Sequence, residues 1–243
     1  MKRFRDLSPE EVMRKVTTEM VLRAVKLGRR KDRRIYISKS SGGQGVPVDH
    51  LDPRTPEGRR ALEQFLTPVK RHYTFHGLGL PEEKNSINWR KLNVSTPRRI
   101  LLFLQLILSL IMKGTPLKNK FLRLMGVHIG KNTEIMQGVW LDHFRPELIF
   151  IGDNTLIGAF SRLTVHAYEG GGRFRYGLIE IGNRCIIGAG TGMGAIKIED
   201  DVRVMPGTVL SPYLTRIRSR SVVGWNPPNV RRLEEQETGE DSD

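Results

Sequence analysis

Three segments of the chain are versions of one pattern: Ile129-Gly130-Lys131-Asn132-Thr133, Ile151-Gly152-Asp153-Asn154-Thr155 and Ile181-Gly182-Asn183-Arg184-Cys185. Each first Ile is followed six residues later by another aliphatic residue, and after six more by a third. These positions are held by Ile135 and Leu141, by Ile157 and Leu163, and by Ile187 and Met193. A fourth row begins at Ile198 and continues with Val204 and Leu210. A fixed period of this kind indicates a repeat architecture.

The period of six predicts a parallel β-helix. One side chain in six points inward, the small residue that often follows it eases close backbone packing, and three short strands complete a coil of about 18 residues, with neighbouring coils ~4.8 Å apart. The row starts lie 22, 30 and 17 residues apart, which is one coil plus four, one coil plus twelve and one coil minus one. The insertions follow Asp142–His143 and His166, and the missing residue falls near Gly194. Insertions in such repeats form loops on one face, often the binding face.

The composition limits the remaining classes. Cys185 is the single cysteine, so neither a disulfide framework nor a cysteine metal site can form within the chain. The net charge is +14, and residues 1–99 contribute most of it, with 23 Lys and Arg against 11 Asp and Glu. A nucleic acid, an anionic membrane or a phosphorylated ligand would suit this excess, and so would a solvated basic face with no partner. Nucleic-acid binding rests on this charge alone, and we do not favour it.

The N-terminal region is predicted to be partly helical. Ser8 caps a helix from Pro9 to Leu27, and Gly28 is expected to end it. The glycine-rich stretch Ser38–Gly45 lacks the ending of a phosphate loop and is interpreted as a connection. Thr55-Pro56-Glu57 opens a second helix that ends before Pro68. His72 and His76 lie four residues apart with no carboxylate suited to a zinc helix, which favours a structural or exposed pair.

A third predicted helix is almost wholly apolar. It follows Ser95-Thr96-Pro97 and runs from Ile100 to Met112, and as a helix of ~20 Å it is too short to cross a bilayer. Basic residues flank it: Arg98, Arg99, Lys113, Lys118, Lys120 and Arg123. It could lie on an anionic membrane through residues 98–123, or cover the end of the β-helix, or pack between subunits.

The order of these features divides the chain. We expect a basic, partly helical region over 1–98, an apolar helix and a connecting helix over 99–125, a β-helix over 126–228, and an acidic disordered tail over 229–243. The fold class is thus mainly β, with an α-helical N-terminal region. With no signal peptide in view, a cytoplasmic location is expected, with the inner face of the membrane as the alternative.

The repeat region also resembles a known family. Leu141-Asp142-His143, Leu163-Thr164-Val165-His166 and the close Val222-Val223-Gly224-Trp225-Asn226-Pro227 are similar to segments of the hexapeptide-repeat acyltransferases, and most of all the sugar O-acetyltransferases. The resemblance spans Val127 to Val230. It implies a left-handed β-helix, a homotrimer with active sites between subunits, and acetyl-CoA as the acyl donor. The acceptor would be a hydroxyl of a sugar or polysaccharide, and no metal would be needed.

The resemblance assigns roles to particular residues. His166 matches the catalytic histidine, and an imidazole that titrates near neutrality suits a general base. Asp142 matches an aspartate that binds the acceptor, although an acidic group there could instead orient the base. Gln137 falls where these enzymes have an asparagine, which implies a further acceptor contact. His143 departs from the family pattern and is either a second acceptor contact or an exposed corner residue. Donor contacts are expected at Gly190, Gly192, Arg203 and Arg218.

Two questions stay open on the sequence. The insertion Glu169–Gly177 is either a lid whose Arg173 or Arg175 meets an anionic group, or a mobile loop without a specific contact. The short, glycine-rich turn Gly190–Gly194 departs from the family pattern. It supports the alternative function, a non-catalytic β-helix scaffold or assembly module.

Overall fold

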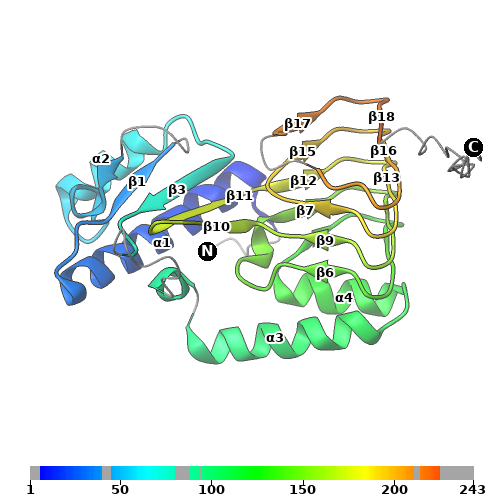
Figure 1. Cartoon of the computed structure of the whole chain (residues 1–243), viewed down its shortest axis with the longest axis horizontal. Helices are drawn as coiled ribbons and strands as arrows, with labels where there is room; N and C mark the ends of the chain where they lie inside the picture. Colours follow the sequence, from blue (N-terminus) through cyan, green and yellow to red (C-terminus); the bar gives the residue numbers. More distant parts are fainter. Residues whose placement is uncertain (1–5, 40–44, 80–87, 94, 211–213, 225–243) are drawn as a thin grey trace, which may run out of the picture.

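The computed structural model describes residues 6–39, 45–79, 88–93, 95–210 and 214–224. An N-terminal sheet with its helices forms one side of the molecule, and an array of short parallel strands forms the other (Figure 1). The predicted mainly β class with helices is confirmed, since several parallel sheets accompany four α-helices among these residues. The predicted acidic tail lies outside them.

The array consists of three parallel sheets that the chain visits in turn. The first holds β4 (His128–Ile129), β7 (Ile149–Ile151), β12 (Ile179–Ile181), β15 (Lys197–Ile198) and β17 (Arg216–Ile217). The second holds β5 (Glu134–Ile135), β8 (Leu156–Ile157), β13 (Ile186–Ile187), β16 (Arg203–Val204) and β18 (Val222–Val223). The third holds β6 (Trp140–Leu141), β9 (Arg162–Leu163) and β14 (Gly192–Met193).

The register of these sheets follows the period of six. Ile151 pairs with Ile129 and with Ile181, and the second and third inward positions pair in the same way. Their side chains form the buried core of the array. The structure also has a fifth row, Ile217 and Val223, which the sequence pattern did not predict. The missing residue falls between Met193 and Ile198, after the glycine-rich turn, so β14 still pairs with β9.

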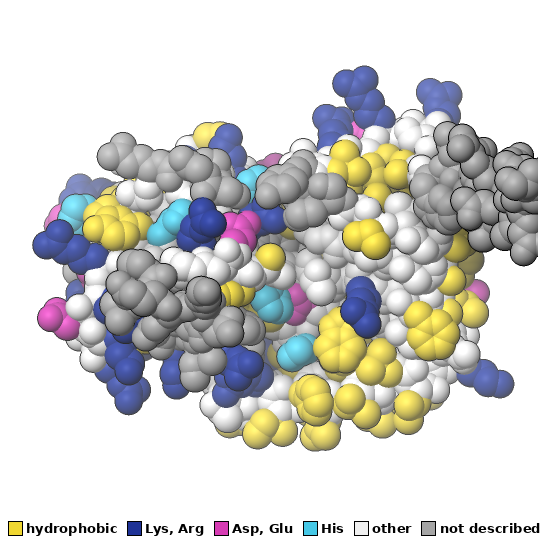
Figure 2. Space-filling view, viewed as in Figure 1, with side chains coloured by type: hydrophobic (Ala, Val, Ile, Leu, Met, Phe, Trp, Pro, Cys, Tyr) yellow, Lys and Arg dark blue, Asp and Glu magenta, His cyan; other side chains and the backbone are white. Residues whose placement is uncertain are grey.

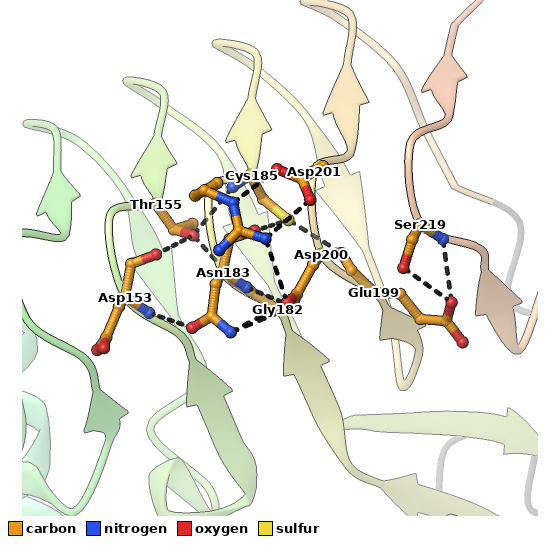
Figure 3. Close-up of polar contacts among 10 residues, drawn as sticks. Asp153, Thr155, Gly182, Asn183, Cys185, Glu199, Asp200, Asp201 and Ser219 are labelled. Carbon is orange, nitrogen blue, oxygen red and sulfur yellow. Dashed lines mark hydrogen bonds and ion pairs between the residues drawn. The ribbon is translucent and has the colours of Figure 1, made fainter.

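Polar side chains tie successive coils together at one corner of the array (Figure 3). The side-chain oxygen of Asn183 accepts from the backbone N–H of Asp153 at 2.8 Å, and Asp200 accepts from that of Asn183 at 2.8 Å. Just inside, the Thr155 hydroxyl donates to the Gly182 carbonyl and accepts from the N–H of Cys185. Cys185 continues this ladder through its thiol and the Glu199 carbonyl. Corner groups that would otherwise be buried without partners are satisfied in this way.

The N-terminal region begins with α1 (Pro9–Lys31), which carries the predicted Ser8 cap. The prediction that Gly28 ends this helix is wrong, because Gly28 is buried within it and the chain leaves the helix at Asp32, in the left-handed conformation. The α2 helix (Pro56–Phe65) ends before Pro68, as predicted. Three strands complete the region: β1 (Tyr36–Ser38), β2 (Val46–Pro47) and β3 (His72–His76). Short 3-10 turns cover Val48–Leu51 and Asn88–Leu92.

The twelve-residue insertion is a hairpin rather than a loop. Its strands β10 (His166–Gly170) and β11 (Arg173–Gly177) are antiparallel, and β11 pairs with β3. The resulting sheet has the order β10-β11-β3-β1-β2, so it combines strands from both halves of the chain (Figure 1). The interpretation as a mobile loop is wrong, because the strands of the insertion are hydrogen-bonded within this sheet. A contact of Arg173 or Arg175 with an anionic group stays a prediction.

The four-residue insertion holds a buried ionic contact with α1. A 3-10 turn over Pro146–Leu148 carries Glu147, and the guanidinium of Arg145 bonds to Glu147 at 3.1 Å and to Glu19 of α1 at 2.9 Å. Arg145 and Glu147 are both fully buried. Removal of one partner would leave an uncompensated buried charge, so this contact fixes α1 against the array.

The predicted apolar helix is α3 (Thr96–Ile111), and α4 (Pro116–Met125) connects it to the array. Neither α3 nor another helix in the described part of the chain is long and apolar enough to cross a membrane. Lys118 does not flank α3 at the surface as the sequence suggests. It is buried, its ammonium donates to the carbonyls of Met136 at 2.7 Å and Met112 at 3.4 Å, and burial lowers its pKa to about 8.

Candidate active site

His166 lies where the hairpin insertion leaves the third sheet, at the first residue of β10. Its Nδ1 is 2.6 Å from Oδ2 of Asp142, which follows β6 in the preceding coil. The same carboxylate accepts the backbone N–H of Val165 at 2.8 Å and that of Phe144 at 2.7 Å. Asp142 is only 1% exposed. The stacking of two coils thus brings a buried carboxylate behind the histidine.

This arrangement selects one tautomer of His166. A carboxylate only accepts hydrogen bonds, so Nδ1 carries the proton and Nε2 is the acceptor nitrogen. The rings of Phe144 and Phe174 lie 4.7 and 5.5 Å from the imidazole, centre to centre, and hold its plane. A neutral imidazole fixed in this tautomer can take a proton from a hydroxyl through Nε2.

A cavity of about 600 Å3 opens beside His166. Of the residues predicted for the site, it is lined by His166, Gly190 and Gly192. Six more charged or polar residues line it: His72, Arg162, Thr164, Arg175, Tyr176 and Thr215. The described residues around the cavity include two arginines and two histidines but no carboxylate. Of the six, Arg162 has an exposed cationic side chain at the cavity and could meet a negatively charged group of a ligand.

His72 reaches this cavity from the N-terminal half of the chain, on β3. Burial lowers its pKa, and the nearby Arg175 and Arg71 guanidiniums lower it further, so the imidazole is neutral at pH 7. Arg175 is itself held by Glu169, with 3.2 Å between Nε and Oε1. The sequence predicted His72 to be a structural or exposed partner of His76 rather than a site residue, because only the pairing of β3 with β11 brings it to the site.

Phe160 lies at the cavity in a strained backbone conformation. Its φ is +60°, at the corner where other coils have Gly138, Gly190 and Gly207 with φ near +70°. Its side chain is 66% exposed, so burial does not explain the residue type. Left-handed backbone at a bulky residue costs about 1–2 kcal/mol and tends to mark functional sites.

The other predicted site residues lie elsewhere. Asp142 is behind His166 rather than on the cavity wall, in the orienting position considered as the alternative. Gln137 is exposed at a corner, and its carbonyl accepts from the N–H of Phe160. His143 packs against Trp140 and against Phe103 of α3, and burial lowers its pKa. Arg203 and Arg218 are exposed on the array and do not line the cavity.

A larger cavity of about 940 Å3 lies over the first parallel sheet and contains none of the predicted site residues. His128 lines it and stacks on Phe150 with 3.9 Å between ring centres. Burial lowers the pKa of His128 to about 4, so it is neutral at pH 7. Among the residues the structure describes, no group of three or more His, Cys, Asp or Glu is arranged to hold a metal ion.

Comparison with known proteins finds similarity in the repeat region. Residues 179–212 match a family model described as the hexapeptide repeat of succinyl-transferase. Over 109 residues the chain is 31% identical to a putative acetyltransferase, YvoF, of Bacillus subtilis strain 168. The alignment covers 44% of this chain and 61% of that relative, less than two thirds of its length.

A solved structure is also similar, a maltose O-acetyltransferase from Clostridium difficile 630. The TM-score is 0.36 at 17% identity, over 52% of this chain and 80% of that one, and a likeness of this size says nothing about the substrate. The similarity to these proteins lies in the repeats, whose register is seen in the parallel strands. The repeat region of this chain is thus similar to hexapeptide-repeat acyltransferases, in agreement with the resemblance in its sequence.

Proposed function

We propose that the protein is an O-acetyltransferase that moves an acetyl group from acetyl-CoA to a hydroxyl of a sugar or saccharide. The observation that carries the proposal is His166 at the wall of a cavity, with its imidazole 2.6 Å from the buried carboxylate of Asp142. The buried carboxylate and the two flanking phenylalanine rings fix the orientation of the imidazole, which a general base requires and a purely structural corner residue does not.

The proposed reaction needs no covalent enzyme intermediate, because the thioester is already activated. His166 takes the acceptor's hydroxyl proton on Nε2, and the oxygen forms a bond to the acetyl carbon. The tetrahedral intermediate collapses with cleavage of the carbon–sulfur bond, and the departing thiolate receives the proton from the imidazolium. Asp142 stabilises the imidazolium through Nδ1, and a backbone N–H would stabilise the oxyanion.

Donor binding is proposed along the glycine side of the cavity. Gly190 and Gly192 leave the main chain open for close approach by the pantetheine arm of acetyl-CoA. Arg162 at this cavity could meet a phosphate of the donor. Arg203 and Arg218, exposed on the array, remain proposed contacts for a donor that extends beyond the cavity.

We also propose a homotrimer of left-handed β-helices, in which a neighbouring subunit completes the open side of the cavity. Support comes from exposed apolar side chains on the array, among them Val209 at 79% and Val222 at 70%. Contacts of the acceptor with Gln137 and His143 would then come from this or a neighbouring subunit. We propose a cytoplasmic location, at the inner face of the membrane.

The test is release of free CoA from acetyl-CoA with a panel of sugars and lipid-linked saccharides. A His166→Asn variant should lose about 10²–10⁴-fold in turnover, which is the usual contribution of a general base. His50→Asn, at an exposed position of the N-terminal region, is the matched control and should retain activity. Full turnover by His166→Asn would refute the proposed base.

The alternative of a non-catalytic scaffold predicts no donor binding. Calorimetric titration with acetyl-CoA separates the two functions, because specific binding by the wild-type protein contradicts a scaffold. The irregular turn that favoured a scaffold keeps its pairing with β9, which removes its main support.

A further inference from the structure

The α3 helix exposes an apolar face that nothing in the described part of the chain covers. Only Leu102, Leu106 and Ser109 are buried on this helix. The exposed residues are between 41% and 75% accessible: Ile100, Leu101, Phe103, Leu104, Ile107, Leu108 and Ile111. Figure 2 shows hydrophobic side chains gathered along the lower edge of the molecule, where Figure 1 has α3. Leu117 and Leu124 of α4 add to the exposed apolar surface.

The charges within the segment that carries α3 and α4 are all of one sign, although Glu134 of the array lies beside Gly114. Residues 95–126 contain no Asp or Glu and six Lys or Arg, of which Lys118 is buried. Arg98 and Arg99 lie in the first turn of α3, where the positive end of the helix dipole disfavours cations. Their position therefore does not serve the stability of the helix itself, whereas it suits an anionic partner.

Three occupants could cover an apolar face with a basic border. A second copy of the chain would place its own basic residues against those of the first, so the charges of the two surfaces would repel rather than complement each other. A folded protein partner would need both a groove and an acidic rim. An anionic lipid surface offers apolar chains beneath a layer of phosphates, which matches an apolar helix whose flanks are basic. The 16-residue α3 is too short to span the bilayer, so it would lie in the plane of the interface.

We infer that α3 docks the protein on an anionic membrane, with its exposed leucine, isoleucine and phenylalanine side chains among the acyl chains. Arg99, Lys113 and Lys120 then lie at the level of the headgroup phosphates. The docked surface adjoins the candidate active site, because Phe103 of α3 contacts His143 with 6.2 Å between ring centres, and His143 follows Asp142. In consequence, and resting on the proposed acyl transfer, the acceptor is one that the membrane presents, such as a lipid-linked saccharide.

The docking can be tested by flotation of the full chain with two kinds of vesicle and no substrate. Phosphatidylcholine vesicles that contain phosphatidylglycerol should bind it at least tenfold more strongly than pure phosphatidylcholine vesicles, since each basic residue near the surface contributes about fivefold. Leu104→Ser with Ile111→Ser should weaken binding to both by about 10–100-fold. Lys113→Glu with Lys120→Glu should abolish the preference for anionic lipid.

A control variant changes an exposed residue elsewhere. Arg60→Glu reverses a charge that is 76% exposed on α2. It should float like the wild type. Equal binding of the wild type to both vesicles, or unchanged binding by the α3 double variant, would overturn the inference. So would a smaller molar mass of that variant by light scattering, which would identify a second copy as the occupant.

The assay is independent of catalysis. Vesicle binding without CoA release would reject the proposed function and leave docking intact. CoA release without vesicle binding would reject docking and leave the function intact.

Discussion

Replacement of Asp142 by Asn would disturb the candidate site because it turns one carboxylate oxygen, a hydrogen-bond acceptor, into an NH2 group, a hydrogen-bond donor. Asp142 accepts three hydrogen bonds, from the N–H groups of Val165 and Phe144 and from Nδ1 of His166. An Asn side chain has one oxygen and one NH2 group. If the oxygen serves Phe144, the NH2 group faces the N–H of Val165 and the imidazole. If the amide is flipped, the N–H of Phe144 is left without an acceptor.

The structure gives two magnitudes for this change. At least one buried backbone N–H loses its partner in either orientation, which costs about 1–3 kcal/mol of folding free energy. With the NH2 group against His166, Nδ1 becomes the acceptor and Nε2 carries the proton. The nitrogen that should take the acceptor's proton is then protonated, and turnover falls by about 10²–10⁴-fold, or about 3–5 kcal/mol in activation free energy.

Urea unfolding and CoA release measure the two effects separately. Asp153→Asn is the matched control, because the Asp153 carboxylate uses Oδ1 to accept one backbone N–H, that of Lys131, and an amide oxygen can do the same. It should remain near wild type in both assays. The reasoning fails if Asp142→Asn keeps wild-type turnover, or if it unfolds at the same urea concentration as the wild type.

Three further predictions concern the array. Gly188→Ala should lower the free energy of unfolding by more than about 3 kcal/mol, because a Cβ there would lie 2.3 Å from the backbone nitrogen of Pro206. Gly207→Ala meets open space at φ +72° and should lower it by only about 1–2 kcal/mol. Equal shifts of the two variants in urea unfolding would contradict this. The pKa of His128 is about 4 when folded and about 6.5 when unfolded, so the unfolded chain binds more protons between these values. Stability should then fall by about 1–3 kcal/mol as the pH drops through this window, while a His128→Asn variant should be flatter by thermal melts. Burial raises the pKa of the Cys185 thiol, so the thiol should react with a disulfide reagent only after the protein unfolds. Cys185→Thr should fold normally, because Thr155 holds the equivalent place in the ladder of hydrogen bonds. Rapid labelling of the folded protein would refute the labelling prediction.

The parallel array was predictable from the sequence because its determinants are local and periodic. Ile129, Ile151, Ile181 and Ile198 each precede a corner, and their pairing follows from the period of six alone. The Ser8 cap and the end of α2 were predictable for the same reason. Gly28 was misjudged because tertiary packing outweighs the tendency of glycine to end a helix: it is buried, with the Arg33 carbonyl close beside its Cα.

The site was only partly predictable. His166 follows from its repeat phase and the insertion after it. The relation of Asp142 to His166 depends on the stacking of neighbouring coils, so the sequence left acceptor binding and orientation of the base as alternatives. His72 and Arg175 arrive through the pairing of β3 with β11, a contact across about one hundred residues that no local pattern signals. The insertion was predicted to be a loop because its three consecutive glycines, at the turn between β10 and β11, are typical of loops, and the strands on either side are short.

The sheet β10-β11-β3-β1-β2 has a consequence for how this protein can be dissected or recombined. A fragment that begins at the first repeat would lack β3, and the hydrogen-bonding edge of β11 would be exposed to water and to other chains. Arg145 would at the same time lose Glu19, its partner on α1. A truncated repeat fragment should therefore be prone to aggregation, and transplanting the repeats alone into another protein should not carry the site with them. The unit that can be expressed, swapped or inherited intact is the first helix, the N-terminal strands and the repeats together.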